Sequence, residues 1–152
     1  MGAVYFYHLT RRPLEVALTE LLTAARSRDM RVAVRGPALD RLAWLDEKLW
    51  LSPEDGFLPH GLAGGEHDAE QPILLTTGPL SNGATCLMSV DGAEITPEEV
   101  GALDRVCVLF DGNDPAALDV ARGQWKALTG AGAAAQYWSE ESGRWEKKAE
   151  SG

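Results

Sequence analysis

The sequence predicts a single α/β domain, with a mostly parallel central sheet that is flanked by helices. One observation is that short runs rich in β-branched, aromatic and aliphatic residues alternate along the chain with segments whose apolar residues recur every three or four positions. A second is that 45% of the 152 residues are hydrophobic and 24% are charged. Such a composition is ordinary for a globular domain that is long enough to bury a core.

The first half of the chain contains two predicted strands and two predicted helices. Residues 3–9 (AVYFYHL) are typical of a strand, and the leucine spacing over 13–28 predicts a helix that opens at Pro13. Residues 30–36 predict a second strand, which ends at Gly-Pro. The following segment 37–50 predicts an amphipathic helix. Its apolar face would hold four leucines, Leu39, Leu42, Leu45 and Leu49.

The second half begins with residues 51–72, whose glycines, prolines and acids predict a long surface loop. Three apolar runs then predict strands at 73–77, 84–90 and 105–110, with a short helix at 96–103 between the last two.

The last predicted helix covers residues 114–130. Asp114 is placed to cap its N-terminus, Pro115 suits its first turn, and Gly130 suits its end. A strand from residue 134 and a charged C-terminal tail, 140–152, close the predicted domain, which covers residues 1–152.

Negative charge is concentrated in the middle of the chain, whose formal net charge is -9. From Leu49 to Asp104 there are ten acidic residues and no lysine or arginine. Binding to duplex DNA needs a broad basic face, which this composition does not favour. A local basic site for an acidic partner remains compatible with it.

Neither a membrane segment nor a disulfide is expected. No apolar run approaches the roughly 20 residues that span a bilayer, and the N-terminus lacks the pattern of a signal peptide. We therefore expect a cytoplasmic protein. Cys86 and Cys107 both lie within apolar runs, so we expect two small buried side chains without a disulfide between them.

The known motifs of enzymes are missing from the expected positions. The loops after the first two strands, LTRRP and VRGP, do not resemble the G-x-G-x-x-G phosphate-binding loop. The fold is therefore expected to be Rossmann-like without a nucleotide-binding fingerprint and without a cofactor. His60, Glu66, His67 and Asp68 lack the spacing of a metal site, and we expect them to be solvated loop residues.

One stretch stands out from this acidic chain. Residues 121–138 contain Arg122, Lys126, two tryptophans and a tyrosine, but no carboxylate. On a helix, Arg122 and Lys126 share one edge, and Trp125 could form an apolar floor below them. A solvated edge beside a core tryptophan is one interpretation of this pattern. The other is a docking site for an acidic peptide.

In three places the sequence resembles the chi subunit of bacterial DNA polymerase III holoenzyme. The opening YFYHL is similar to the first strand of that family. Residues 45–64 (LDEKLWLSPEDGFLPHGLAG) match its L-D-x-x-L-W and F-x-P-H-x-L-A-G block. Residues 121–128 (ARGQWKAL) match its A-R-x-x-[WY]-K-A helix motif.

The resemblance implies a non-enzymatic replication adaptor, monomeric in isolation and without a cofactor. Chi subunits link the clamp loader to single-stranded DNA-binding protein, whose acidic C-terminal tail ends in Pro-Phe with a free carboxylate. The tail-binding positions of the family fall on Arg122, Trp125 and Lys126. The surface that binds the psi subunit, or another clamp-loader component, falls on Trp50 and Phe57. DNA would be engaged only indirectly.

Two functions of other classes stay open from the sequence. One is a nucleotide-dependent enzyme on a Rossmann-like sheet. The other is direct binding of single-stranded DNA on Trp125, Tyr137 and Trp138, although the net negative charge opposes it.

Overall fold

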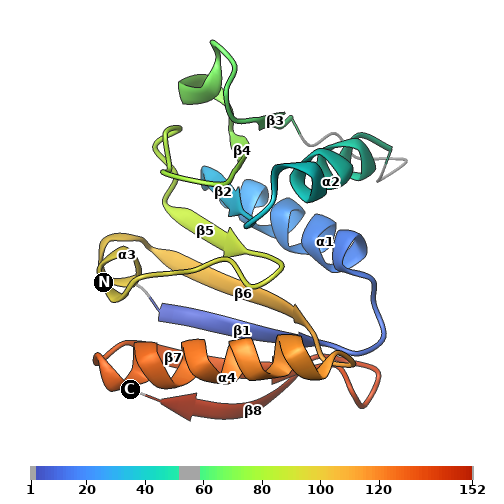
Figure 1. Ribbon diagram of the computed structural model, residues 1–152, viewed down its shortest axis with the longest axis vertical. Coiled ribbons are helices and arrows are strands. Elements are labelled where there is room, and N and C mark those ends of the chain that lie inside the picture. Colours follow the sequence, from blue (N-terminus) through green and yellow to red (C-terminus); the bar gives the residue numbers. More distant parts are fainter. Residues whose placement is uncertain (1–2, 52–58, 152) are drawn as a thin grey trace.

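The computed structural model describes residues 3–51 and 59–151, and it confirms the α/β prediction. Its strands form one sheet in the order β3-β4-β2-β5-β6-β1-β7-β8 (Figure 1). All neighbouring strands are parallel except β7 and β8, which are antiparallel. The strands are β1 (Ala3–Leu9), β2 (Val32–Arg35), β3 (Gly61–Leu62), β4 (Ile73–Thr76), β5 (Cys86–Ser89), β6 (Arg105–Asp111), β7 (Ala134–Ser139) and β8 (Glu146–Ser151).

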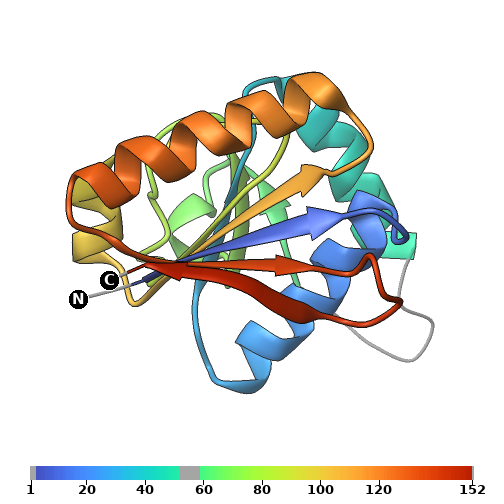
Figure 2. The ribbon, with the colours of Figure 1, turned by 90° about the horizontal axis from the view of Figure 1, so that it is seen from below.

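Helices cover both faces of the sheet, and Figure 2 shows α4 and α1 on opposite sides of it. Residues of α1 and α2 pack in one core cluster, and those of α3 and α4 pack in the other. The α-helices of the described residues are α1 (Leu14–Ser27), α2 (Leu39–Leu51), α3 (Pro97–Ala102) and α4 (Pro115–Gly130), and a short 3-10 turn, η1, covers Asp68–Glu70.

Strand β1 shows how the two cores divide the sheet. Val4 and Phe6 belong to the cluster under α4, whereas Tyr7 and Leu9 belong to the cluster under α1. This division follows from the period of two in a strand, which sends successive side chains to opposite faces. The same alternation separates the two aromatic residues of β7, because Tyr137 packs with the α4 cluster and Trp138 with the α1 cluster.

Helix α4 begins where the sequence predicts. The Asp114 side chain accepts a hydrogen bond from the Ala116 backbone N–H at 3.0 Å, and Pro115 occupies the first turn. These features occupy a backbone donor at the helix start and so stabilise the helix. The helix runs to Gly130 and buries Ala121 and Leu128 against the sheet.

Two expectations about side-chain burial need correction. Leu39, predicted on the apolar face of its helix, is 60% exposed because it is the first residue of α2, while Leu42, Leu45 and Leu49 are buried. His60, predicted to be solvated, is buried, and its ring nitrogen lies 3.0 Å from the Asp46 carbonyl oxygen.

Two segments expected to be irregular carry some regular structure. The predicted loop 51–72 contains β3 and η1 within its described part, and the predicted charged tail forms β8, which pairs with β7. Cys86 and Cys107 are buried free thiols, as predicted. In the part of the chain that is described, no helix is long and apolar enough to cross a bilayer.

The chain changes direction across the sheet between β1 and β6, which are neighbours. After β1 it crosses one face through α1 to reach β2, and after β6 it crosses the other face through α4 to reach β7. The loops that follow β1 and β6 therefore diverge at the carboxyl edge of the sheet. In α/β folds such a divergence leaves a crevice at that edge.

Candidate functional site

The two cations of the predicted site lie on the exposed edge of α4. Arg122 and Lys126 are one turn apart, and both are exposed. The Arg122 guanidinium lies 3.7 Å from the carboxylate of Asp119, and both side chains are at least three-quarters exposed. An ion pair this exposed is weak, so it leaves Arg122 available to an incoming anion.

Trp125 is partly buried and belongs to the core under α4. Its ring meets Phe6 edge-on at a centroid distance of 5.3 Å and Tyr137 at 6.2 Å. Aromatic pairs favour this edge-to-face arrangement. Contacts with Phe6 of β1 and Tyr137 of β7 therefore fix the orientation of the indole ring.

An apolar hollow opens beside this tryptophan. We define the apolar hollow by its lining residues, Phe110, Leu118, Ala121, Arg122, Trp125 and Tyr137. Its volume is about 280 Å³. It joins Arg122 and Trp125, but Lys126 lies outside its lining. Arg122 is the one charged side chain among the described residues that line it, so an apolar group inside the hollow would lie next to a guanidinium.

A second, polar cavity adjoins the hollow. We define the polar cavity by its lining residues, His8, Thr10, Arg11, Gly112, Asn113, Leu118, Arg122, Tyr137 and Glu141. Its volume is about 610 Å³, and it shares Leu118, Arg122 and Tyr137 with the apolar hollow. The two spaces thus meet at a wall made by α4 and β7.

Tyr137 experiences charges from both sides of this wall. Partial burial raises the pKa of its phenol, the negative charge of Glu141 raises it further, and the positive charge of Arg122 opposes the rise. The hydroxyl is therefore a neutral group at physiological pH, able to donate a hydrogen bond.

The buried ring of His8 is held under the polar cavity. Its Nδ1 lies 2.9 Å from the Ser139 hydroxyl, and its ring lies 5.8 Å from that of Tyr137. A side chain at Gly112 would overlap the far side of the imidazole. Because glycine has no side chain, Gly112 leaves room for the His8 ring.

Arg11, His8 and Glu141 were not singled out by the sequence reasoning. The sequence marks Arg11 and Glu141 only by their positions, because Arg11 follows the carboxyl end of β1 and Glu141 follows the carboxyl end of β7. Parallel strands bring such ends to one edge of a sheet. Recognising the group from the sequence would require knowing that β1 lies between β6 and β7.

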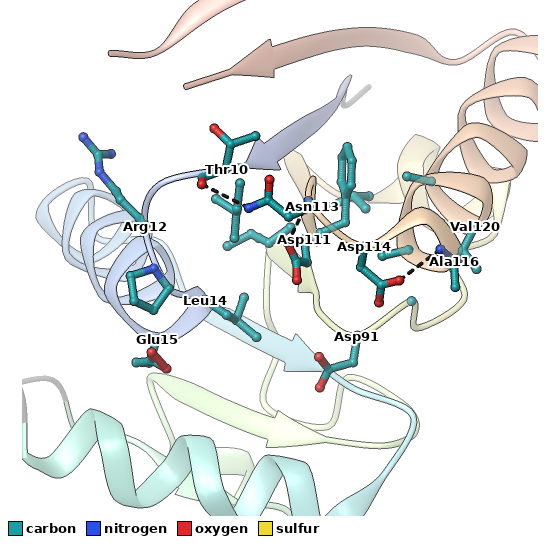
Figure 3. A pocket seen from close by; sticks show the side chains of 18 of the residues that line it. Thr10, Arg12, Leu14, Glu15, Asp91, Asp111, Asn113, Asp114, Ala116 and Val120 are labelled. Carbon is teal, nitrogen blue, oxygen red and sulfur yellow. Dashed lines mark hydrogen bonds between the residues drawn. The ribbon is translucent and has the colours of Figure 1, made fainter. Parts of the chain in front are cut away.

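A third cavity lies at the divergence of the chain between β1 and β6, and the β1–α1 loop lines both this cavity and the polar cavity. Its volume is about 780 Å³. Figure 3 shows the carboxylates of Asp91 and Asp114 facing this space, whereas Arg12 points away from it. Arg12 instead pairs with Glu20 at 3.0 Å.

This arrangement does not favour the nucleotide-dependent alternative. A nucleotide in an α/β crevice places its phosphates at a helix N-terminus. Here Asp114 already occupies the start of α4, and carboxylates face the crevice. The described residues that line this cavity include four carboxylates and three arginines, and Arg41 already pairs with Asp91 at 3.2 Å. The lining therefore offers no net positive charge to a phosphate.

The alternative of single-stranded DNA binding is also weakened by the geometry. Trp125 and Tyr137 line the apolar hollow, but Trp138 packs against the core on the other face of the sheet. The three rings therefore do not form one continuous platform on which successive bases could stack.

The second predicted surface is described only in part. Trp50 lies at the end of α2 and is 51% exposed, and its ring lies 4.1 Å from that of the buried His60. Phe57 lies outside the described residues.

The chain was compared with models of known protein families. The family model described as DNA polymerase III chi subunit, HolC, matches residues 1–136, which include Trp50, Phe57, Arg122, Trp125 and Lys126. Tyr137, Glu141 and strand β8 lie beyond the matched part. No curated protein matches the chain. Because the family model covers most of the 152 residues, the chain belongs to the DNA polymerase III chi subunit family, an accessory subunit of the polymerase with a role in DNA replication.

Proposed function

We propose that this chain is a replication adaptor that links the clamp loader to the acidic C-terminal tail of single-stranded DNA-binding protein. The tail would bind at α4 through Arg122, Trp125 and Lys126. One observation carries the proposal: in a chain of net charge -9, an apolar hollow has a guanidinium on its rim and a second cation one turn away.

The chemistry of the tail matches this site. The terminal phenylalanine ring would enter the apolar hollow and contact Trp125, and the free α-carboxylate would meet Arg122. Arginine binds carboxylates through two parallel hydrogen bonds, which makes this pairing strong and directional. Lys126 would act as a point charge for the acidic residues that precede the terminal phenylalanine.

The adaptor role requires no catalysis and no cofactor, and we place it in the cytoplasm. The chain would contact DNA only through single-stranded DNA-binding protein. This is consistent with its net negative charge, which disfavours a direct phosphate-binding surface.

We further propose that Trp50 and Phe57 form the surface for the clamp-loader side, either the psi subunit or another component. The exposure of Trp50 supports this, because its neighbour Leu49 is buried and already anchors α2 to the core. A half-exposed tryptophan is a frequent energetic centre of protein interfaces.

The test is a titration by fluorescence anisotropy with a labelled acidic peptide that ends in Pro-Phe. Arg122→Ala and Lys126→Ala should each weaken binding by about 1 to 3 kcal/mol, the range for hydrogen bonds to charged groups. Binding should also weaken with salt, because exposed charges are screened over about 8 Å at physiological ionic strength.

The thermal stability of both variants should match that of the wild type, since their side chains are exposed. A peptide that lacks the terminal phenylalanine should bind far more weakly. If the double variant binds the peptide as tightly as the wild type, the tail binds elsewhere, and Arg122 and Lys126 are only solvated residues on the edge of a helix.

A further inference from the structure

We propose that the tail site extends into the polar cavity, where Arg11 supplies a further cation and Glu141 acts as an internal carboxylate that weakens binding. This inference rests on the proposed function, and it identifies two residues outside the family's tail-binding motif. The expected occupant is the carboxylate-bearing end of the acidic tail.

The apolar hollow and the polar cavity are adjacent, so one ligand could occupy both. Arg122 and Tyr137 line both the apolar hollow and the polar cavity. A terminal phenylalanine with its ring in the hollow therefore has its backbone next to the polar cavity. Carboxylates of that residue and of its acidic neighbours would then lie between α4 and the β1–α1 loop.

Arg11 is held at this cavity by the backbone. Its Nη2 and Nε donate to the Glu141 carbonyl oxygen at 2.9 and 3.3 Å. Because a carbonyl carries no net charge, these bonds orient the guanidinium without neutralising it. Two arginines from separate elements thus line one cavity, which suits an anion better than either exposed cation alone.

A donor without a partner supports the same chemistry. The Oγ1 atom of Thr10 is buried and makes no hydrogen bond within the described structure. Thr10 lines the polar cavity, and a rotation about its χ1 angle would let the hydroxyl donate a hydrogen bond to an incoming carboxylate. A buried polar atom without a partner is uncommon in folded proteins, and a ligand is one way to satisfy it.

Glu141 is the one carboxylate among the described residues that line this cavity. Its side chain is 64% exposed, and one carboxylate oxygen lies 3.4 Å from His8 Nδ1. A negative charge here repels the negative charges of the tail. Removing the Glu141 charge should therefore raise peptide affinity, whereas removing the Arg11 charge should lower it. Substitutions at the two residues test the proposal in opposite directions.

The experiment uses the full chain and the labelled acidic Pro-Phe peptide at low and physiological salt. Arg11→Ala should weaken binding by about fivefold or more, consistent with the loss of a hydrogen bond to a charged group. Arg11→Gln removes the charge but keeps a donor for the Glu141 carbonyl, and it should weaken binding similarly. Glu141→Gln should strengthen binding by about two- to threefold, the scale of an exposed charge interaction.

Two controls carry the same charge changes at distant positions. Arg28→Ala alters an exposed arginine at the other end of α1, and Glu47→Gln alters an exposed carboxylate on α2, which packs on the opposite face of the sheet. Both should leave affinity close to that of the wild type. Thermal melting of every variant separates loss of binding from loss of folding.

The outcomes distinguish this inference from the function on which it rests. If Arg122→Ala loses binding while both Arg11 variants behave like Arg28→Ala, the tail site stands and its extension into the polar cavity is wrong. An affinity of Glu141→Gln no higher than that of Glu47→Gln would overturn the role of Glu141. If the wild type fails to bind the peptide, both proposals fall together.

Discussion

The rings of Trp125 and Phe6 meet edge-on, with centroids 5.3 Å apart and planes inclined at 64°. Phe6 is fully buried in β1, whereas Trp125 lines the apolar hollow. One tryptophan thus belongs both to the core and to the proposed binding surface, and its substitutions should affect stability and affinity to different degrees.

Trp125→Ala should lower the free energy of unfolding by about 2 to 4 kcal/mol, because it removes a large ring that packs against the core. Trp125→Phe should retain most of the stability, since a smaller ring can still contact Phe6. Urea unfolding measures both variants, and peptide titration of Trp125→Phe measures the site in a folded protein. Equal stability of Trp125→Ala and the wild type would show that the ring is not part of the core.

Gly112→Ala should destabilise the fold by about 1 to 3 kcal/mol, the usual effect of overfilling a packed site. The added methyl group would overlap the buried His8 ring. The matched control is Gly123→Ala, within α4, where a methyl group would meet no atom within 4 Å. It should stabilise the protein by about 0.5 to 1 kcal/mol through helix propensity. Similar melting temperatures for the two variants would contradict the packing argument.

Glu99→Gln should destabilise the protein in a way that depends on pH. Arg35 donates two hydrogen bonds to the Glu99 carboxylate, at 2.9 and 2.7 Å, and the carboxylate also accepts from the Thr96 backbone. The Arg35 hydrogen bonds hold the pKa of Glu99 below its usual range, and burial opposes them only in part. A carboxyl group with a lowered folded pKa binds its proton more readily in the unfolded chain.

The stabilisation from Glu99 is therefore complete above the unfolded pKa of about 4.3 and is lost as pH falls through the folded value. At pH 7 the variant should be less stable by about 1 to 3 kcal/mol. This difference should shrink toward zero below the folded pKa. Chemical unfolding of both proteins across this range provides the measurement, and a difference that stays constant with pH would rule out the ion pair as its source.

Phe57→Ala and Trp50→Ala should abolish association with the clamp-loader side while tail binding persists. Truncating an aromatic anchor at an interface weakens binding by about 2 kcal/mol or more. A pull-down from cell extract followed by a binding titration with the identified partner measures the effect. Leu49→Ala serves as the contrasting variant, because Leu49 is buried and its loss should reduce stability instead. If Phe57→Ala melts early and loses both partners, Phe57 is a core residue.

Much of the fold could be predicted because its signals are local. Apolar spacing identified α1, α2 and α4, and short apolar runs identified the buried parallel strands, since each pattern follows from the geometry of its own backbone. Asp114 and Thr96 mark helix starts by the same local logic, because a cap needs only the next two or three residues. Arg122 and Trp125 could likewise be grouped from their spacing on one helix.

Strand β8 was missed because its sequence, EKKAES, carries no apolar pattern. It forms by backbone pairing with β7, and its lysines suit an exposed edge that must not pair further. Trp145 anchors it from the preceding turn, 5.3 Å from the Tyr7 ring. A strand of this kind depends on a partner that only the completed sheet provides.

The sequence by itself determined the helices, the buried strands and the cationic, aromatic edge of α4, because each depends on residues close together in the chain. Only the tertiary structure decided that Arg11, Glu141 and Arg122, which come from three separate parts of the chain, line one cavity. The physical reason is the crossover of α4 over β1, which inserts β1 between β6 and β7. That strand order is stabilised by packing across the whole sheet, and a local pattern cannot encode it.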